Sequence, residues 1–175
     1  MRTDPAGSVV ALGGSVSVVQ SGLLDALRGM DIRLLDRNRP GISAAEVDRM
    51  RVEGFSADVF IASSNAITSD GRLVNIDGSG NRVACMMHGP AKVVLLAGMN
   101  KVVASLEDAM SRIRNHAAPL NAVRLDRDTP CARTGFCDEP GCRPPGRICG
   151  QVAVIENSKT AGRMTVVLTG EHLGF

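Results

Sequence analysis

The sequence predicts an α/β fold built on a mostly parallel sheet. Three observations lead to this prediction: short apolar runs recur along the chain, helix-like stretches separate them, and turn residues bound most of them. Strands that alternate with helices are typical of βαβ units, whose crossover helices cover the faces of a parallel sheet. At 175 residues the chain can form a substantial core, so we expect one domain over residues 1–175.

The elements follow from the apolar pattern in chain order. Helical spacing predicts a helix over residues 16–28, a second beginning at Ser43 with Glu46 in a capping-box pattern, and a third over residues 106–113. The last two apolar runs are close enough to pair as a hairpin. The expected strands are residues 8–12, 32–35, 58–64, 73–76, 82–87, 92–98, 152–156 and 163–170.

The composition argues against several classes of protein. Twenty basic and eighteen acidic residues give a net charge of +2, too balanced for electrostatic binding of nucleic acid. Aromatic residues make up only 2% of the chain, which disfavours stacking on single-stranded nucleic acid. No apolar run approaches the ~20 residues that span a bilayer, and the first residues do not resemble a secretory signal. We therefore expect a cytoplasmic protein with no membrane insertion.

Four of the five cysteines fall within residues 129–150, a segment rich in Cys, Gly, Pro and Arg. Such a segment cannot bury an apolar face by itself and needs another constraint to be ordered. In a reducing compartment the cluster indicates a metal site rather than disulfides. The fifth cysteine, Cys85, lies in an apolar run and is expected to be a buried core thiol. The expected metal ligands are Cys131, Cys137, Cys142 and Cys149.

Two metal centres are compatible with these cysteines. Their spacing, C-x5-C-x4-C-x6-C, lacks the paired C-x2-C knuckles of the usual structural zinc site. Loop-borne ligands with flanking Arg133, Arg143 and Arg147 suit the net negative charge of an iron–sulfur cluster. We therefore favour a 4Fe–4S cluster over zinc. Free or redox-paired thiols in a flexible loop are the remaining alternative.

A small anion could bind the turn formed by Gly13, Gly14 and Ser15, between the first strand and the first helix. The glycines permit close approach, and Ser15 can cap the helix while backbone N–H groups face the ligand. The turn lacks the Lys-Ser/Thr of a P-loop and does not match G-x-G-x-x-G. A plain tight turn is the alternative.

Polar residues also follow the third expected strand. Asp70-Gly71 is a hairpin turn pair, and a second loop follows at residues 77–81, although a hairpin needs only one turn. Open α/β sheets bind ligands beyond the carboxyl ends of their strands, so we expect a polar ligand mouth here. Asp77 would orient a hydroxyl and Arg82 would clamp a carboxylate or phosphate; solvated turns are the alternative. The expected lining is Asn65, Thr68, Gly71, Asn75, Asp77, Gly78, Gly80, Asn81 and Arg82.

Several stretches in this order resemble the LUD (lactate utilization) domain family, LutC/YkgG-like. They are GGS, ADVFIASSNAITSDGRLVNIDGSGNRV, HGPAKVVLLAGMNKVV, RIRNHAAPLNAVRL and the closing GEHLGF. The Cys-rich segment before that ending is similar to one branch of the family. The resemblance implies a NagB/RpiA/CoA-transferase-like α/β sandwich around a mostly parallel central sheet, with a Cys-rich C-terminal loop.

The resemblance also implies a part in the oxidation of lactate to pyruvate, together with iron–sulfur or oxidoreductase partner subunits. We therefore expect an accessory or electron-transfer subunit for oxidation of lactate or a related 2-hydroxy acid, with a small anionic metabolite as ligand. Two features depart from the relatives. The first strand begins soon after Met1, where this branch has a helical extension. No glutamate occurs between Glu53 and Glu107, so the glutamyl–CoA chemistry of CoA-transferases is not supported.

Two other functions stay open at this point. One is an independent enzyme or binding protein for a phosphorylated small molecule or nucleotide. The other is a redox-sensing or structural metal protein, in which the metal only orders the Cys-rich loop. The sequence decides neither whether the chain is itself an enzyme nor whether it forms a homo-oligomer.

Overall fold

The computed structural model describes residues 6–137 and 139–175. The chain divides into two compact units, each assembled from separate stretches of sequence. The first unit comprises residues 1–63, 84–99 and 158–174, and the second comprises residues 64–83, 100–157 and 175. This division does not test the single domain expected from the sequence, which stays a prediction.

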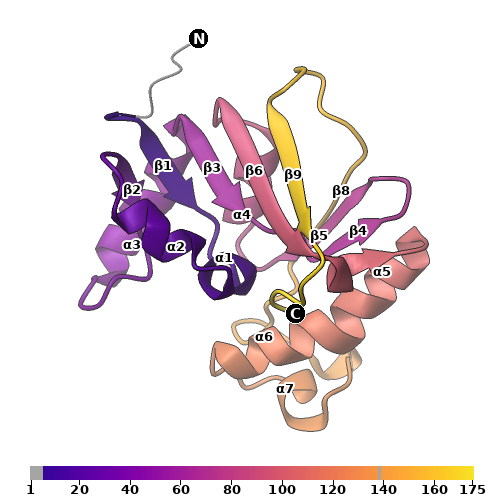
Figure 1. Cartoon of the computed structure of the whole chain (residues 1–175). Coiled ribbons are helices and arrows are strands. Elements are labelled where there is room, and N and C mark those ends of the chain that lie inside the picture. Colours follow the sequence, from indigo (N-terminus) through magenta and orange to yellow (C-terminus); the bar gives the residue numbers. More distant parts are fainter. Residues whose placement is uncertain (1–5, 138) are drawn as a thin grey trace. The chain divides into compact units, whose positions relative to one another are not determined.

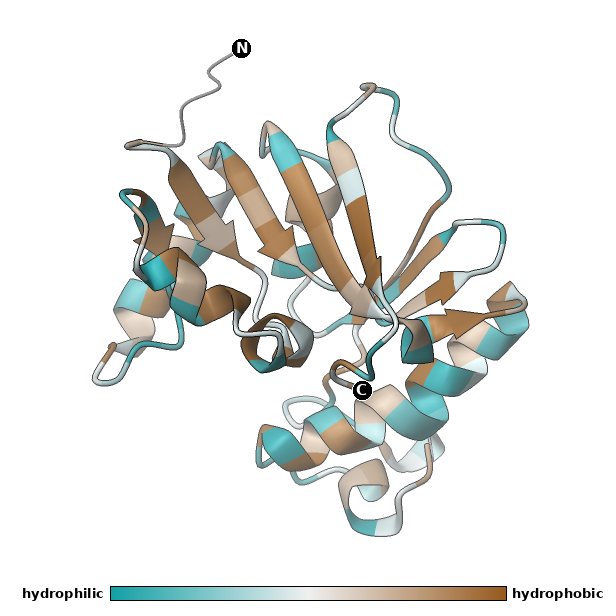
Figure 2. Ribbon diagram, in the orientation of Figure 1, coloured by the Kyte–Doolittle hydropathy of each residue, from teal (hydrophilic) through white to brown (hydrophobic). Residues whose placement is uncertain are grey.

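A five-stranded sheet forms the centre of the first unit, in the order β2-β1-β3-β6-β9 (Figure 1). All of its neighbouring strands are parallel. Figure 2 shows that apolar residues dominate these strands, as expected for a parallel sheet with covered faces. The α/β class with a mostly parallel central sheet is confirmed. The strands are β1 (Val9–Leu12), β2 (Arg33–Leu35), β3 (Val59–Ala62), β6 (Lys92–Gly98) and β9 (Met164–Thr169).

Two short helices, α1 (Val16–Gln20) and α2 (Leu23–Arg28), pack against one face of this sheet. The sequence predicted a single helix here, and that prediction is wrong. Gly22 has φ 75°, a left-handed conformation that glycine adopts without steric cost, and it turns the chain from α1 into α2. The buried cluster comprises Val10, Leu12, Val18, Leu24, Leu27 and Ile61.

Helix α3 (Ala44–Glu53) begins at the predicted capping box. The Ser43 side chain accepts a hydrogen bond from the Glu46 amide at 3.2 Å, and the Glu46 carboxylate accepts one from the Ser43 amide at 3.1 Å. A short helix, η1 (Gly54–Ser56), follows directly. Cys85 is buried in this unit, as predicted.

Residues 82–87, predicted as a strand, belong instead to helix α4 (Asn81–Met87). A short apolar run fits a strand or a buried helix equally well, so periodicity could not decide. The Asp77 carboxylate stabilises the start of the helix, because it accepts hydrogen bonds from the amides of Arg82 at 3.0 Å and Val83 at 3.1 Å. These amides lie in the first turn of the helix, where backbone donors have no partner within the helix.

The second unit contains a four-stranded sheet in the order β7-β4-β5-β8. Strands β4 and β5 form an antiparallel hairpin at the predicted Asp70-Gly71 turn, where the Gly71 amide donates to the Thr68 carbonyl at 2.8 Å. The suggested pairing of the last two apolar runs is wrong, since β8 pairs with β5 and β9 pairs with β6. Every residue of β8 pairs with a residue of β5, and every residue of β9 pairs with a residue of β6. Closeness in sequence alone does not predict these partners. The strands are β4 (Ala66–Thr68), β5 (Leu73–Asp77), β7 (Val102–Val103) and β8 (Gln151–Ile155).

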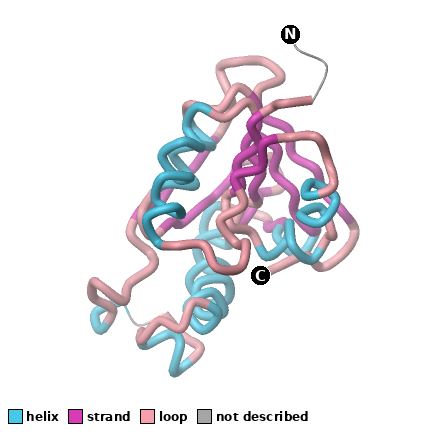
Figure 3. Tube along the Cα trace, turned by 90° about the vertical axis from the view of Figure 1, so that its left-hand side faces the viewer, coloured by secondary structure: helices cyan, strands magenta, loops and turns pink. Residues whose placement is uncertain are grey.

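The helices of the second unit follow one another with short connections (Figure 3). A core of Ala66, Val74, Ile76, Ala109 and Ile113 joins them to the sheet, with Cys149 packed against it. No helix in the described part of the chain is long and apolar enough to cross a membrane. The helices are α5 (Leu106–Arg112), the π-helix η3 (Ile113–Ala117), α6 (Ala118–Arg124), α7 (Pro130–Thr134) and η4 (Glu139–Gly141), while η2 (Met99–Lys101) leads into β7.

Candidate functional site

The Cys-rich segment carries its cysteines on short elements and loops of the second unit. Thr129 caps α7, with its side-chain oxygen accepting from the Ala132 amide at 3.4 Å. Gly135 ends this helix at φ 78°, so the chain reverses between Cys131 and Cys137. The remaining two cysteines follow η4 and precede β8. They are Cys142 and Cys149.

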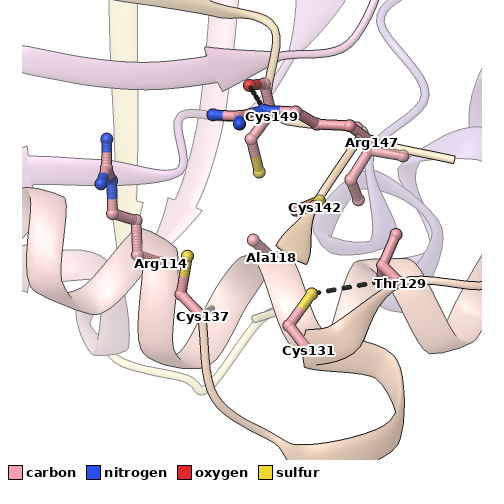
Figure 4. Close-up of a pocket in the computed structure, with 9 residues that line it drawn as sticks. Arg114, Ala118, Thr129, Cys131, Cys137, Cys142, Arg147 and Cys149 are labelled. Carbon is pink, nitrogen blue, oxygen red and sulfur yellow. Dashed lines mark hydrogen bonds between the residues drawn. The ribbon is translucent and has the colours of Figure 1, made fainter. Parts of the chain in front are cut away.

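All four cysteines of the segment line one pocket, which we call the four-cysteine pocket (Figure 4). None of these four described residues forms a disulfide. Figure 4 shows their side chains around a common space, although they are spread over the whole length of the segment. The structure therefore brings together the residues that the sequence singled out as metal ligands. The other residues that line the pocket are Arg114, Ala118, Thr129, Arg147 and Ile148.

Two arginines line the four-cysteine pocket. Arg147 was expected there, and its Nε donates to the Cys149 carbonyl at 2.9 Å. Arg114 comes from η3, outside the Cys-rich segment, and nothing in the cysteine spacing pointed to it. Ala118, on α6, also lines the pocket and was equally missed.

The other two arginines of the segment make different contacts. Arg133 forms an ion pair with Asp128. Arg143 donates to the Cys142 carbonyl at 3.2 Å. Neither is among the residues that line the pocket, so the positive charge of the segment is only partly directed at the cysteines.

The electrostatics of the pocket disfavour several charged thiolates without a compensating positive charge. Burial, and then the negative charge of the other three cysteines, raise the pKa of the Cys149 thiol to about 11, while Arg147 acts in the opposite direction. Four thiolates in one pocket therefore require a positive charge between them. Four-thiolate sets fit an iron–sulfur cluster or a zinc ion. Over residues 6–137 and 139–175, no three His, Cys, Asp or Glu side chains are grouped so as to hold a metal ion.

A second polar feature, which we call the Arg82 network, unites Asn65, Asn75, Asp77 and Arg82. Arg82 is only 8% exposed. Its Nε donates to Asp77 at 3.1 Å and its Nη2 donates to the Asn65 side chain at 2.9 Å, while Nη1 donates to the Asn75 side chain. The Asn65 amide donates to the Asn75 side chain at 3.1 Å. The β4–β5 hairpin brings these distant positions together.

The geometry gives Arg82 a role inside the chain. It ties the end of β5 to the start of α4, through partners on both sides of the hairpin. Arg82 is therefore not a solvent-exposed arginine on a loop, as the alternative of solvated turns would require. Its additional role as an anion clamp stays a prediction.

Other residues of the predicted mouth lie in the turns around this network. The Thr68 hydroxyl donates to the Asp70 carboxylate within the hairpin, whose tip carries Gly71. The Asn81 side chain accepts from the Ser79 hydroxyl at 2.8 Å at the start of α4. These contacts stabilise the turns themselves.

Close backbone packing explains why glycines occupy the loop after β5. A Cβ on Gly78 would meet the Ile148 carbonyl at 3.4 Å, and a Cβ on Gly150 would meet the Gly78 carbonyl at 2.7 Å. Gly80 has φ 81° and lies beside the Gln151 side chain. The loop after β5 therefore packs closely against the residues around Cys149. The glycines here allow two stretches of this chain to approach each other closely.

The Gly13-Gly14-Ser15 turn belongs to the first unit. Ser15 caps α1 as predicted, accepting from the Val18 amide at 3.3 Å. Gly14 has φ 67°, and a Cβ there would meet the Arg37 guanidinium at 2.7 Å. The turn thus has the tight geometry expected from the sequence and an arginine beside it. Its function as an anion site stays a prediction.

Lys101 was missed by the sequence reasoning. It lies in the second unit and is 4% exposed, which is uncommon for a lysine. Burial, and then the positive charges of Arg112 and Arg82, lower its pKa to about 7. A single lysine between Asn100 and Val102 carries no pattern in the sequence, and only the fold reveals its surroundings.

These features define an α/β protein with a parallel central sheet and a pocket lined by four cysteines. The chain belongs to the LUD domain family, whose sequence model matches residues 3–169. At the level of the family it is a lactate-utilization-type protein. Among curated proteins, none matches the chain.

Similar solved structures are distant in sequence. A DUF162 family protein from Deinococcus radiodurans is 11% identical, with a TM-score of 0.41, over 93% of this chain and 87% of that one. The eIF2B delta protein from Chaetomium thermophilum is 16% identical, with a TM-score of 0.38, over 63% of this chain and 50% of that one. A D-ribose-5-phosphate isomerase in complex with phospho-erythronic acid is 12% identical, with a TM-score of 0.34, over 59% of this chain and 50% of that one.

Proposed function

We propose that this LUD-domain protein is an accessory or electron-transfer subunit in the oxidation of lactate or a related 2-hydroxy acid, and that its four-cysteine pocket holds a 4Fe–4S cluster. The observation that carries the proposal is the convergence of four cysteines on one pocket, from a segment with little regular structure. Membership of the LUD domain family supports the link to lactate utilization.

The pocket residues would have distinct tasks. The four cysteines would bind the cluster as thiolates, and the cluster would take up and release single electrons. Arg114 and Arg147 would offset part of the negative charge of the cluster and its ligands, which favours the reduced form and raises the reduction potential. The apolar side chains of Ala118 and Ile148 would limit the access of water.

The proposal includes a small-anion site at the Arg82 network. Its support is the concentration of polar side chains around one buried guanidinium at the carboxyl end of β5, including the fully buried Asn75. A few convergent polar groups around a buried cation can fix the orientation of a small anion. The two electrons released by oxidation of the 2-hydroxy acid would pass to an iron–sulfur or oxidoreductase partner subunit, and the two protons to solvent.

A redox titration of anaerobically prepared protein tests the electron-transfer role. We expect the visible absorption of the cluster to bleach on addition of dithionite and to return on reoxidation, with iron in the preparation. The Cys85→Ala variant is the matched control, because Cys85 lies in the first unit and should leave the spectrum unchanged. Protein that binds zinc alone and shows no reversible reduction would favour the structural-metal function and overturn this one.

Ligand-dependent melting tests the substrate class. Any ligand that binds only the folded chain raises its melting temperature. Lactate and related 2-hydroxy acids should raise it, whereas nucleotides and CoA should not. A shift with nucleotides alone would support the alternative of an independent nucleotide-binding protein.

A further inference from the structure

Strand β9 forms one edge of the five-stranded sheet in the first unit, and β2 forms the other (Figure 1). An edge strand presents a row of backbone N–H and C=O groups to which another strand can pair, and short length or charged side chains usually protect it. Strand β2 has this protection, because it has three residues and carries the exposed Arg33. Strand β9 has six residues, MTVVLT, and none of them is charged. The β9 edge therefore lacks the protection that the β2 edge has.

Apolar side chains of β9 are exposed on both faces of the sheet. Val166 is 39% exposed, Val167 is 42% and Leu168 is 47%, and successive side chains of a strand point to opposite faces. Their register partners on β6, residues 95–97, are at most 8% exposed. The side chains that cover β6 on its two faces thus leave β9 open. Contiguous apolar side chains exposed in this way are typical of an interaction site.

The pairing of β9 with β6 determines which backbone groups point outward. The Val93 amide donates to the Arg163 carbonyl at 2.8 Å, and Val93 pairs in register with Met164. Backbone groups alternate in direction along a strand, so the odd-numbered residues of β9 bond to β6 and the even-numbered residues direct their N–H and C=O groups away from it. Among the residues that the structure describes, no strand pairs with this outer row. The occupant that fits the row is another β-strand.

We propose that two copies of this chain pair through β9, antiparallel and about a two-fold axis at Val167. Each five-stranded sheet then continues into the sheet of the other copy. Two-fold dimers are the commonest soluble oligomers, and their interface must be complementary to itself. This inference depends on neither the metal centre nor the anion site.

The sequence of β9 is complementary to itself in this register. Hydrogen-bonded pairs of antiparallel strands need outward-pointing groups on both strands, so even-numbered residues must lie opposite even-numbered residues. An axis at Val167 meets this condition, because it places Val166 opposite Leu168 of the second copy. It also places Thr165 opposite Thr169 of the second copy. Apolar pairs and Thr–Thr pairs directly across antiparallel strands are favourable.

Charge complementarity supports the same register. Arg163 and Glu171 flank the strand at equal distances in sequence from Val167, so the arginine of each copy faces the glutamate of the other. Glu171 is exposed, and the Arg163 guanidinium donates to three backbone carbonyls, which do not neutralise its charge. An axis at Val166 would also satisfy the outer row, but it would place Arg163 opposite Thr169 and lose this pair of opposite charges.

Sedimentation equilibrium of the whole chain, prepared anaerobically with a reducing agent so that no disulfides form between copies, tests the proposal. The wild type should have twice the chain mass of 18.4 kDa. Val167→Lys and Val167→Glu should each be monomeric, because like charges then lie directly opposite each other at the axis. An equimolar mixture of the two variants should regain the dimer, since a lysine then faces a glutamate. Val52→Lys, at an exposed valine of α3, is the matched control and should remain dimeric.

Three outcomes would overturn the proposal. A monomeric wild type would show that a second copy does not cover this edge. A dimer that persists in Val167→Lys would show that the copies associate through another surface. A mixture that stays monomeric, when each variant alone is monomeric, would contradict the pairing of Val167 with itself. Melting curves establish that both Val167 variants are folded, as expected for substitutions at an exposed position.

Discussion

The buried Lys101 gives the protein a distinctive pH dependence of stability. Its pKa is about 7 in the folded chain and near the ordinary 10.5 when unfolded. Between these values the unfolded chain binds more protons, so folding stability contributed by this residue rises with pH, by at most about 1.4 kcal/mol per pH unit. Below pH 7 the full cost of the buried charge is present.

The Lys101→Met variant isolates this contribution. We expect the difference in unfolding free energy between variant and wild type to favour the variant most at pH 6 and to shrink as the pH rises towards 10. Urea unfolding across this range measures it. Parallel curves for the two proteins at every pH would contradict a lowered pKa at Lys101.

Arg82 is predicted to be a structural residue whether or not it binds a ligand. Arg82→Ala removes the charged donor from the side chains of Asn65, Asn75 and Asp77, which keep only their backbone donors. Removing one partner of a buried charged pair costs about 3–5 kcal/mol. Urea unfolding should show this loss, whereas Arg49→Ala, on the exposed surface of α3, should change stability by less than about 0.5 kcal/mol. Equal stability of the two variants would contradict the network.

A finer substitution, Arg82→Lys, tests the anion clamp. An ammonium cannot reproduce the fork of a guanidinium, so lactate binding should weaken by about 1–3 kcal/mol in a variant that remains folded. Calorimetric titration measures the change. Unchanged affinity in the lysine variant would restrict Arg82 to its structural role.

At the scale of elements, the packing of the β5 loop against the end of the Cys-rich segment makes Gly150 critical. A Cβ there would lie 2.7 Å from the Gly78 carbonyl, a contact too short for real atoms. The Gly150 amide also donates to the Asp77 carbonyl at 2.8 Å, so the backbone has little freedom to move away. Gly150→Ala should therefore destabilise the protein by about 1–3 kcal/mol.

Gly170 is the matched control for this substitution, because no atom lies within 4 Å of a Cβ placed there. Thermal unfolding of the two alanine variants measures the difference. If Gly150→Ala and Gly170→Ala melt together, the two backbone stretches do not pack as described. Loss of bound metal in Gly150→Ala alone would further connect this packing to the position of Cys149.

The sequence predicted elements well where side-chain chemistry is local. The capping box at Ser43 and the Asp70-Gly71 hairpin are decided by neighbouring residues, and both are confirmed. It failed where a partner outside the short apolar run decides. Residues 82–87 form a helix because Asp77 binds the amides of its first turn, and β8 pairs with β5 rather than with β9. The residues of a short apolar run do not indicate either interaction.

At the scale of the whole molecule, the residues of the candidate site were also only partly predictable from the sequence. Cysteine is rare enough that four in one short segment indicated a shared pocket, which the structure supports. Arg114 and Lys101 were not predictable, because a single arginine in a helix or a single lysine after a strand is common. Only the fold places Arg114 at the pocket and Lys101 beside Arg82 and Arg112.

A shared metal centre predicts that the cysteines act as a unit. Changing any one of the four to serine should cost nearly as much as changing all four, since the loop then loses its constraint. Limited proteolysis should cut between Thr129 and Gly150 in each variant and spare the metal-loaded wild type. Equal resistance of wild type and variants would show that no metal orders this segment.

The most direct test of the central claim is the metal content and visible spectrum of protein purified under anaerobic conditions, measured beside the Cys142→Ser and Cys85→Ala variants. A 4Fe–4S cluster in the four-cysteine pocket predicts brown wild-type protein with iron and acid-labile sulfide in equal amounts, about four of each per chain. Cys85→Ala should retain both, and Cys142→Ser should lose both. Colourless wild-type protein without iron, or iron content unchanged in Cys142→Ser, would contradict the cluster.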